Sequence, residues 1–123
     1  MKNVVVSGGF DPVHIGHIRL FKKARKLGDK LIVIVNSDNF LLEKKGYVFM
    51  SFKERKEIIE NISYVDKVFK SIDKDNTVIE SIKALKEKNL IDIFANGGDR
   101  QNKDDIPEYS LCEKLGIETV LKS

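Results

Sequence analysis

The sequence GGFDPVHIGH occupies residues 8–17 and separates two patterns of different periodicity. Before it, residues 2–7 hold three consecutive valines, a short apolar run that is typical of a buried strand. After it, residues 14–26 carry apolar side chains at helical spacing, and Gly28 ends this pattern. The segment is therefore predicted to be the turn that leads from a first strand into the amino terminus of a first helix.

Such a turn favours the binding of an anion. Glycine allows the backbone to approach a phosphate group closely, and a helix amino terminus presents unpaired N–H groups and a positive potential. His14 and His17, the chain's two histidines, are three residues apart and so lie on one face of the first helical turn. Both can donate hydrogen bonds to a phosphoryl group. The alternative is that they only cap or support the helix.

The rest of the chain alternates between strand and helix patterns. Ser51 with Glu54, and Thr77 with Glu80, have the spacing of capping boxes and predict helix starts, and Pro107 suits a first helical position. This alternation predicts an α/β fold in which helices cover both faces of a five-stranded parallel sheet. A ligand is expected beyond the carboxyl ends of the strands, near the loops after the first, second and fourth. The predicted strands are residues 2–7, 30–36, 65–69, 91–95 and 118–121, and the predicted helices are residues 14–26, 51–61, 78–88 and one that starts at residue 107.

The composition is that of one globular domain spanning residues 1–123, with 41% hydrophobic and 33% charged residues. The 22 basic and 19 acidic residues are interleaved and leave a net charge of +3, so no nucleic-acid partner is expected. No apolar run approaches the about 20 residues of a membrane span, and no signal peptide precedes the first strand. The one cysteine, Cys112, offers neither an internal disulfide nor a metal-ligand cluster. A cytoplasmic protein without a membrane partner is expected.

The motif Gly9-Phe10-Asp11-x-x-His14-x-Gly16-His17 resembles the signature of the HxGH nucleotidyltransferase superfamily. Within that superfamily the chain is similar to the glycerol-3-phosphate cytidylyltransferases over roughly residues 3–100. The resemblance implies a Rossmann-like three-layer sandwich and a homodimer. Besides the motif, it rests on the segments His17-Ile18-Arg19-Leu20, Leu27-Gly28-Asp29, Ser37-Asp38-x-Phe40, Glu54-Arg55-Lys56 and Tyr64-Val65-Asp66.

The resemblance also implies an activity. A nucleotidyl group would pass from a nucleoside triphosphate to a small phosphorylated acceptor such as glycerol 3-phosphate or a sugar phosphate, with Mg²⁺ assisting and pyrophosphate leaving. In-line attack of one anion on another builds negative charge around the α-phosphorus, and fixed donors must meet that charge. The loop Gly97-Gly98-Asp99 is more similar to heptose-phosphate adenylyltransferases, so CTP and ATP are both open as donors. A different hypothesis is a nucleotide-binding module on the same fold with little or no turnover.

The resemblance further implies roles for single residues. His14, His17 and Lys44 would be catalytic, and Lys45 and Arg55 would bind the acceptor or its phosphate. Lys44 and Lys45 are expected in a loop, where the alternative is two solvated lysines, and for Arg55 the alternative is surface ion pairing with neighbouring glutamates. The residues that would bind the nucleotide are Gly8, Gly9, Phe10, Asp11, Gly16, Gly97, Asp99 and Arg100.

Three departures from the family pattern limit what can be carried over. Gly46 stands where the family has a lysine, and Ser63 stands where it has an arginine. Cytidylyltransferases also have an Arg-Thr-x-Gly-Ile-Ser-Thr-Thr segment after the last strand, whereas this sequence stops at Ser123. Arg100 and Lys103 are the nearest residues that could replace this segment in binding the phosphates of the nucleotide. We therefore expect either weak nucleotide binding with slow turnover or a natural protein that continues beyond Ser123.

Overall fold

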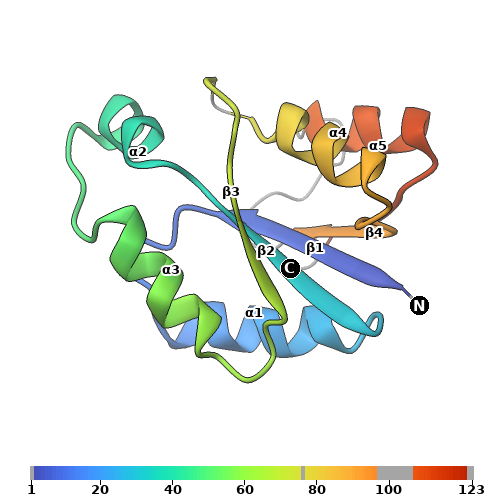
Figure 1. Ribbon diagram of the computed structural model, residues 1–123, viewed down its shortest axis with the longest axis horizontal. Coiled ribbons are helices and arrows are strands. Elements are labelled where there is room, and N and C mark those ends of the chain that lie inside the picture. The colour runs from blue at the N-terminus through green and yellow to red at the C-terminus, as the bar shows by residue number, and fades with distance from the viewer. Residues whose placement is uncertain (1, 76, 97–106, 122–123) are drawn as a thin grey trace.

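The computed structural model describes residues 2–75, 77–96 and 107–121, which contain five strands and five helices (Figure 1). Each predicted strand and helix is present, and the structure adds a helix, α2, that the patterns above do not predict. In chain order the elements are β1 (Asn3–Gly8), α1 (Ile15–Arg25), β2 (Lys30–Val35), α2 (Asp38–Lys45), α3 (Phe52–Glu60), β3 (Lys67–Lys70), α4 (Ile79–Glu87), β4 (Ile93–Asn96), α5 (Pro107–Leu115) and β5 (Glu118–Leu121).

The five strands form one parallel sheet in the order β3-β2-β1-β4-β5. β1 lies at the centre, where Val4 is paired with Leu31 of β2 and with Ile93 of β4. The predicted α/β fold with a five-stranded parallel sheet is thus confirmed. Because the strand order reverses between β1 and β4, the expected ligand crevice lies beyond the carboxyl ends of these two strands.

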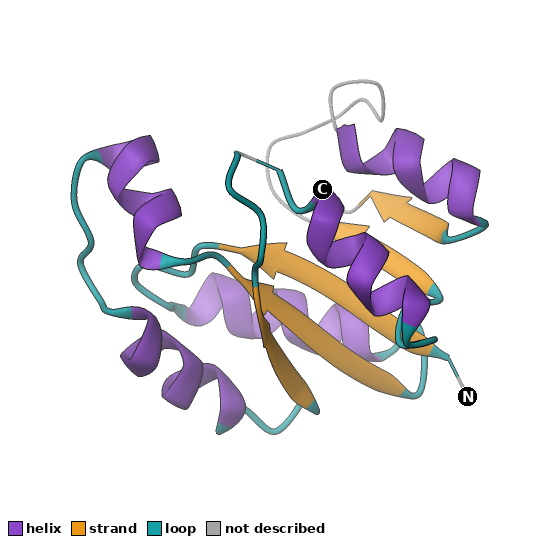
Figure 2. Cartoon of the chain, turned by 45° about the horizontal axis from the view of Figure 1, so that its top comes forward, coloured by secondary structure: helices purple, strands orange, loops and turns teal. Residues whose placement is uncertain are grey.

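Helices cover both faces of the sheet, as Figures 1 and 2 show. On one face, α1 and α3 contribute Phe21 and Ile59 to a core that includes Val4 and Val6 of β1. On the other face, Val5 of β1 belongs to a second core with residues of α4 and α5. Alternate residues of β1 therefore serve opposite helical layers, as the geometry of a strand requires. The members of the second core from α4 and α5 are Ile82, Leu85, Tyr109 and Cys112.

The additional helix, α2, changes the predicted surroundings of two lysines. Ser37 is its N-cap residue and accepts a hydrogen bond from the Phe40 N–H at 3.2 Å. The helix ends at Gly46, whose positive φ of 85° is a conformation that glycine adopts readily. Lys44 and Lys45 therefore lie in the last turn of a helix, and the expectation that they lie in a loop is wrong.

One of the two predicted capping boxes is also wrong. Ser51 caps α3 as expected and accepts the Glu54 N–H at 3.3 Å. The N-cap residue of α4 is Val78, and its side chain makes no capping hydrogen bond. Instead, the carboxylate of Asp73 accepts backbone N–H groups of the first turn of α4, from Glu80 at 2.7 Å and from Ser81 at 2.9 Å. A carboxylate forms a stronger, charge-assisted cap than a threonine hydroxyl, so Asp73 takes the place predicted for Thr77.

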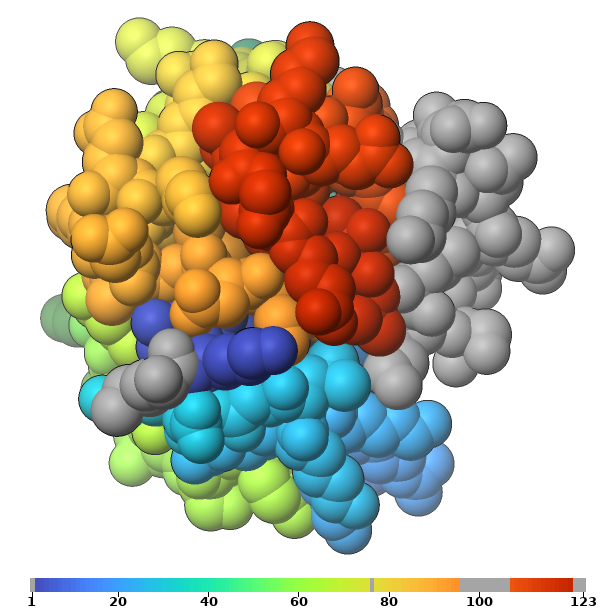
Figure 3. Space-filling view, turned by 90° about the vertical axis from the view of Figure 1, so that its right-hand side faces the viewer, coloured from blue at the N-terminus to red at the C-terminus, as the bar shows by residue number. Residues whose placement is uncertain are grey.

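The two ends of the sheet are covered differently. Figure 3 looks onto the end where the strands begin, and the start of β1 is visible there between the α4–α5 layer and the layer that contains α1. At the opposite end, α2 lies beyond the carboxyl end of β2 (Figure 1). The loops expected to bind ligand therefore lie at the end of the sheet that α2 partly covers. Within the described ranges, no helix is both long and apolar enough to cross a membrane.

Candidate active site

The amino terminus of α1 is capped by its own two histidines. His14 is the N-cap residue, and its Nδ1 accepts a hydrogen bond from the Gly16 N–H at 3.1 Å. In return, Nδ1 of His17 accepts the His14 N–H, also at 3.1 Å. The two imidazole rings are stacked, with their centroids 3.8 Å apart. The structure thus brings both histidines together at the predicted turn, and their Nδ1 atoms do cap the helix.

These hydrogen bonds fix where the ring protons lie. Because each Nδ1 is an acceptor, a neutral imidazole in this position carries its proton on Nε2. Burial lowers the pKa of His17 to about 4, and the neighbouring His14 adds to the lowering. His17 is therefore neutral near pH 7 and offers an Nε2–H donor without a positive charge.

The ring of Phe10 supports His17. The two rings meet edge to face with their centroids 4.9 Å apart, and Phe10 also packs against Phe21 at 5.4 Å. Phe10 is 5% exposed and has a positive φ of 54°, a backbone conformation that costs a bulky residue about 1–3 kcal/mol. The ring lies in the core despite this cost. This placement makes Phe10 a support for the histidine, and its ring is not presented to a bound nucleotide.

Two glycines of the turn allow rings to lie against the backbone. A Cβ atom on Gly8 would lie 2.8 Å from the Phe10 ring, and one on Gly16 would lie 2.9 Å from Cε1 of His14. Both distances are well below the about 3.5–4.0 Å of favourable carbon contacts, so each ring would have to move. Glycine is therefore required at both positions for the observed arrangement of Phe10 and His14.

The start of α1 lacks a carboxylate that would compete with an anionic ligand. The other four helices each carry an acidic residue in the first turn, whereas α1 carries none. The positive potential of this helix terminus is therefore not compensated from within the helix. Together with the Nε2 atoms of His14 and His17, it forms a site that suits a phosphate group.

Asp11 ties the turn to the segment that follows α2. Its carboxylate accepts hydrogen bonds from Nζ of Lys45 at 2.9 Å, from the Phe49 N–H at 2.8 Å and from the Met50 N–H. Burial by itself would raise the pKa of Asp11, but these hydrogen bonds outweigh it and hold the pKa below its usual value. Because the side chain is 1% exposed, Asp11 orders the loop and does not present its carboxylate to a ligand.

Arg55 is fully buried, which corrects the expectation that it contacts the phosphate of the acceptor. Its guanidinium donates to the carbonyl oxygens of Met50, Gly9 and Asn36 at 2.9, 2.8 and 2.8 Å. It also pairs with the carboxylate of Asp38 at 2.7 Å. The planar fork of arginine can bridge several acceptors in this way. Arg55 is therefore a positioning residue that joins three loops of the site, and surface ion pairing with neighbouring glutamates does not occur.

The two lysines at the end of α2 have different surroundings. Lys45 is held by Asp11, and its Nζ lies 4.8 Å from the centroid of the Tyr47 ring. Lys44 is exposed, with its Nζ 5.7 Å from the Phe40 centroid, and it forms no ion pair with another described residue. Lys44 is thus the lysine that remains available for a phosphate group, while Lys45 has a partner inside the protein.

The remaining predicted residues cannot be placed in the site. Gly97, Asp99 and Arg100, which the resemblance assigns to the nucleotide, lie outside the described residues. Conversely, no pattern in the sequence predicts a role for Asp38, which pairs with Arg55. An acidic residue directly after an N-cap serine is common in helices, so the sequence carries no signal for this longer-range contact.

Comparisons with known proteins agree with this geometry. A family model described as cytidylyltransferase-like matches residues 5–116. A glycerol-3-phosphate cytidylyltransferase of Bacillus subtilis is 37% identical over 105 residues, which are 85% of this chain and 78% of the relative. An FAD synthase of Pyrococcus abyssi is 40% identical over 113 residues, 91% of this chain and 70% of the relative. A solved structure, a lipopolysaccharide core biosynthesis protein of Thermoplasma volcanium, has a TM-score of 0.75 at 27% identity and covers 99% of this chain and 94% of its own.

A parallel sheet whose central strand leads into a histidine-capped anion site defines an α/β protein of the nucleotide-binding class. The comparisons assign it further: the chain belongs to the cytidylyltransferase-like family. The predicted family and its class of activity, nucleotidyl transfer, are thereby confirmed.

Proposed function

We propose that this protein transfers a nucleotidyl group from CTP or ATP to a small phosphorylated acceptor, such as glycerol 3-phosphate or a sugar phosphate, and releases pyrophosphate. The observation that carries the proposal is the pair of histidine Nε2 atoms at the start of α1, where no acidic residue of the first turn competes. Relatives named as a cytidylyltransferase and as an FAD synthase support it.

For this reaction the protein mainly has to position the two substrates and stabilise the negative charge of the transition state. An oxygen of the acceptor phosphate attacks the α-phosphorus, and the bond from that phosphorus to the leaving pyrophosphate breaks with its electron pair going to pyrophosphate. Negative charge grows on the oxygens around the α-phosphorus, where the Nε2–H groups of His14 and His17 and the ammonium of Lys44 can stabilise it. Since His17 is neutral in the protein without ligand, it meets an incoming triphosphate as a hydrogen-bond donor.

Mg²⁺ is proposed to be bound together with the triphosphate, whose charge it would neutralise. Magnesium in sites of this kind takes one or two protein carboxylates and otherwise substrate phosphates and water. Among the residues that the structure describes, no three His, Cys, Asp or Glu side chains are grouped to hold a metal by themselves.

The assembly and the location are proposals of the same kind. The resemblance to cytidylyltransferases supports a homodimer, and the composition supports a cytoplasmic protein with no nucleic-acid or membrane partner. Light scattering at micromolar concentration tests the proposed dimer, because a measured mass near the 14.0 kDa of one chain would contradict it.

Pyrophosphate release tests the proposed activity. The protein is incubated with Mg²⁺, with CTP, ATP, GTP or UTP, and with each acceptor of a panel that includes glycerol 3-phosphate and several sugar phosphates. Release that requires both substrates is expected. The alternative, a nucleotide-binding module, predicts a rise in Tm with a triphosphate, since ligand binding stabilises the folded state, but no pyrophosphate with any acceptor.

A further inference from the structure

A polar pocket lies between α2 and the segment that joins β3 to α4. It has a volume of about 250 Å³ and both of its walls follow the carboxyl ends of neighbouring strands, β2 and β3. The pocket is therefore at the same end of the sheet as the start of α1, but it is lined by other residues. These are Ser37, Asn39, Phe40, Glu43, Asp73 and Lys74.

The strand order places this pocket on one side of the phosphate site. β2 and β3 lie on one side of the central β1, and β4 and β5 lie on the other. A nucleotide is expected at the reversal of strand order, between β1 and β4. In-line displacement puts the attacking oxygen and the leaving pyrophosphate on opposite sides of the α-phosphorus. The side of β2 and β3, which the nucleotide leaves open, is the side from which an acceptor can approach.

Hydrogen bonds within the protein fix both walls of the pocket. In the wall formed by α2, the hydroxyl of Ser37 is occupied by the Phe40 N–H. In the other wall, the carboxylate of Asp73 is occupied by the first turn of α4, and Asp73 is 7% exposed. These two polar side chains hold the walls in place, and the carboxylate of Asp73 is not available to contact a ligand.

Three lining side chains are available instead. Asn39, Glu43 and Lys74 are exposed, and none of them has a side-chain hydrogen bond or ion pair with another residue of the described ranges. The carboxylate of Glu43 accepts hydrogen bonds, the ammonium of Lys74 donates them, and the amide of Asn39 does both. This set matches hydroxyl groups, which both donate and accept hydrogen bonds. Because the ammonium of Lys44 lies 5.7 Å from the centroid of Phe40, which lines the pocket, a molecule whose hydroxyls bind here can place its phosphate at Lys44.

The pocket does not suit a cationic or a large aromatic acceptor. Phe40 is its one aromatic residue, and the ammonium of Lys44 already lies 5.7 Å from the centroid of that ring. A ligand cation placed over the same ring would be repelled by Lys44. The volume of about 250 Å³ is also smaller than the about 300–1,000 Å³ typical of sites for drug-sized ligands. A short, hydroxylated chain or one sugar ring fits these limits.

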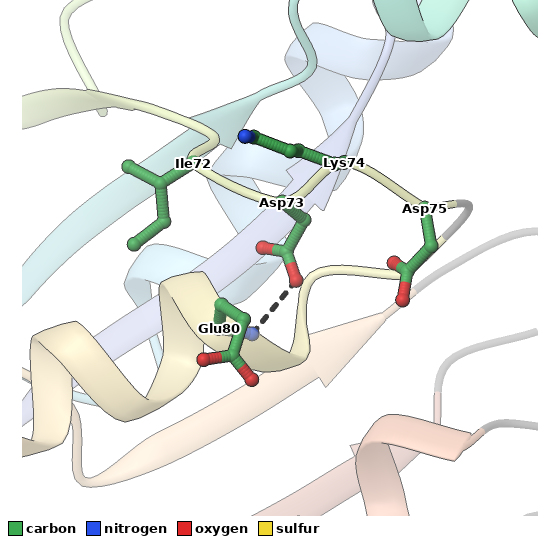
Figure 4. A pocket seen from close by; sticks show the side chains of 5 residues that line it. All are labelled: Ile72, Asp73, Lys74, Asp75 and Glu80. Atoms are coloured by element: carbon green, nitrogen blue, oxygen red, sulfur yellow. Dashed lines mark hydrogen bonds between the residues drawn. The ribbon is translucent and has the colours of Figure 1, made fainter.

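A second hollow lies on the other side of the same segment and is less suited to a phosphorylated ligand. Its volume is about 500 Å³, and Figure 4 shows the carboxylates of Asp75 and Glu80 on it, with Lys74 directed away from both. Asp75 already accepts hydrogen bonds from the N–H and the hydroxyl of Thr77 at 2.9 and 2.7 Å. Three of its five lining residues, Asp73, Asp75 and Glu80, are acidic, and the ammonium of Lys83 near it is already paired with Glu80 at 3.4 Å. This surplus of carboxylates disfavours an anion and favours the pocket against α2 as the acceptor side.

We infer that the pocket between α2 and the β3–α4 segment binds the hydroxylated part of the acceptor, a polyol phosphate or sugar phosphate, with Glu43 and Lys74 as its specificity-determining residues. This inference rests on the proposed nucleotidyl transfer and names the acceptor class for it. Phosphocholine, which is cationic, and flavin mononucleotide, which carries a large aromatic ring system, would be poor acceptors.

The test compares four variants in the pyrophosphate assay. Glu43→Ala and Lys74→Ala change the pocket, and Glu113→Ala and Lys114→Ala are matched controls at exposed positions on α5. Each of the first two is expected to raise the KM for a polyol or sugar phosphate roughly 10- to 100-fold, the usual effect of losing a hydrogen bond to a charged group. The KM for the triphosphate should stay within about twofold, and the controls should leave both constants unchanged.

A second measurement separates this inference from the proposed function. Glycerol 3-phosphate and glucose 1-phosphate are titrated into ¹⁵N-labelled protein, and the backbone amide shifts of Asn39, Glu43 and Lys74 are followed. Shifts at these amides support the pocket even if no pyrophosphate is released, a result that would refute only the activity. An active enzyme whose acceptor KM is unchanged in both pocket variants overturns the inference and leaves the activity in place. A preference for phosphocholine or flavin mononucleotide overturns it as well.

Discussion

Replacing Arg55 by lysine is expected to destabilise this protein strongly although the charge is kept. The guanidinium makes four hydrogen bonds, to three carbonyl oxygens and to Asp38, and is fully buried. A lysine ammonium is a point donor on a flexible stem and cannot reproduce this fork. If two of the four contacts are lost at about 1.5–3 kcal/mol each, the free energy of unfolding falls by about 3–6 kcal/mol.

The assay is thermal unfolding followed by circular dichroism, with Arg25→Lys as the matched control. Arg25 is paired with Asp66 at 3.3 Å, and both side chains are 37% exposed, so this exposed pair is worth at most about 1 kcal/mol. At roughly 4 °C per kcal/mol for a domain of this size, Arg55→Lys should lower Tm by roughly 12–24 °C and Arg25→Lys by a few degrees. Equal Tm values for the two variants would refute the claim that Arg55 joins the loops of the site.

Three further predictions concern the turn before α1. The pKa of His17 is about 4 in the folded protein, whereas an unperturbed histidine, as in the unfolded chain, has a pKa of 6.5. Between pH 4 and pH 6.5 the unfolded chain therefore binds more protons than the folded protein. The free energy of unfolding should therefore fall as the pH drops from 6.5 towards 4, and an acid titration of His17→Asn should show less of this fall. Asp11→Asn removes the charge that holds Lys45, and a lower urea midpoint than that of the wild type is expected, whereas an unchanged midpoint would contradict the role of this pair. Gly16→Ala adds a Cβ that would lie 2.9 Å from the His14 ring, so kcat should fall while the protein stays folded by circular dichroism.

Periodic patterns predicted most of the fold. The apolar residues of β2 and the helical spacing in α1 are strong signals, because burial on both faces of a parallel sheet leaves nearly continuous apolar runs. α2 was missed because Phe40, Leu41 and Leu42 are consecutive and do not mark one helical face. Its end signals, Ser37 before the helix and Gly46 after it, were present in the sequence and would have identified it.

The site was predicted in part. The histidines and glycines of the turn act locally, within one strand end and one helical turn, so sequence spacing places them correctly. Arg55 contacts residues that lie 5 to 46 positions away, and Asp11 contacts residues that lie 34 to 39 positions away. Most of these contacts are with backbone groups. Backbone carbonyls and amides are the same in every residue, so a sequence cannot show which of them a buried side chain will meet.

The most direct test of the central claim separates the two functions of the His17 ring. His17→Asn keeps an acceptor that can cap the His14 N–H, as Nδ1 does now, but lacks the Nε2–H donor. His17→Ala removes both. We predict that kcat falls by about 10²–10³ in both variants, with triphosphate affinity changed much less, while His17→Asn retains more of the wild-type Tm than His17→Ala. If His17→Asn turns over as fast as the wild type, the ring serves only to cap α1, and the claim that its Nε2–H stabilises the transferring phosphoryl group is wrong.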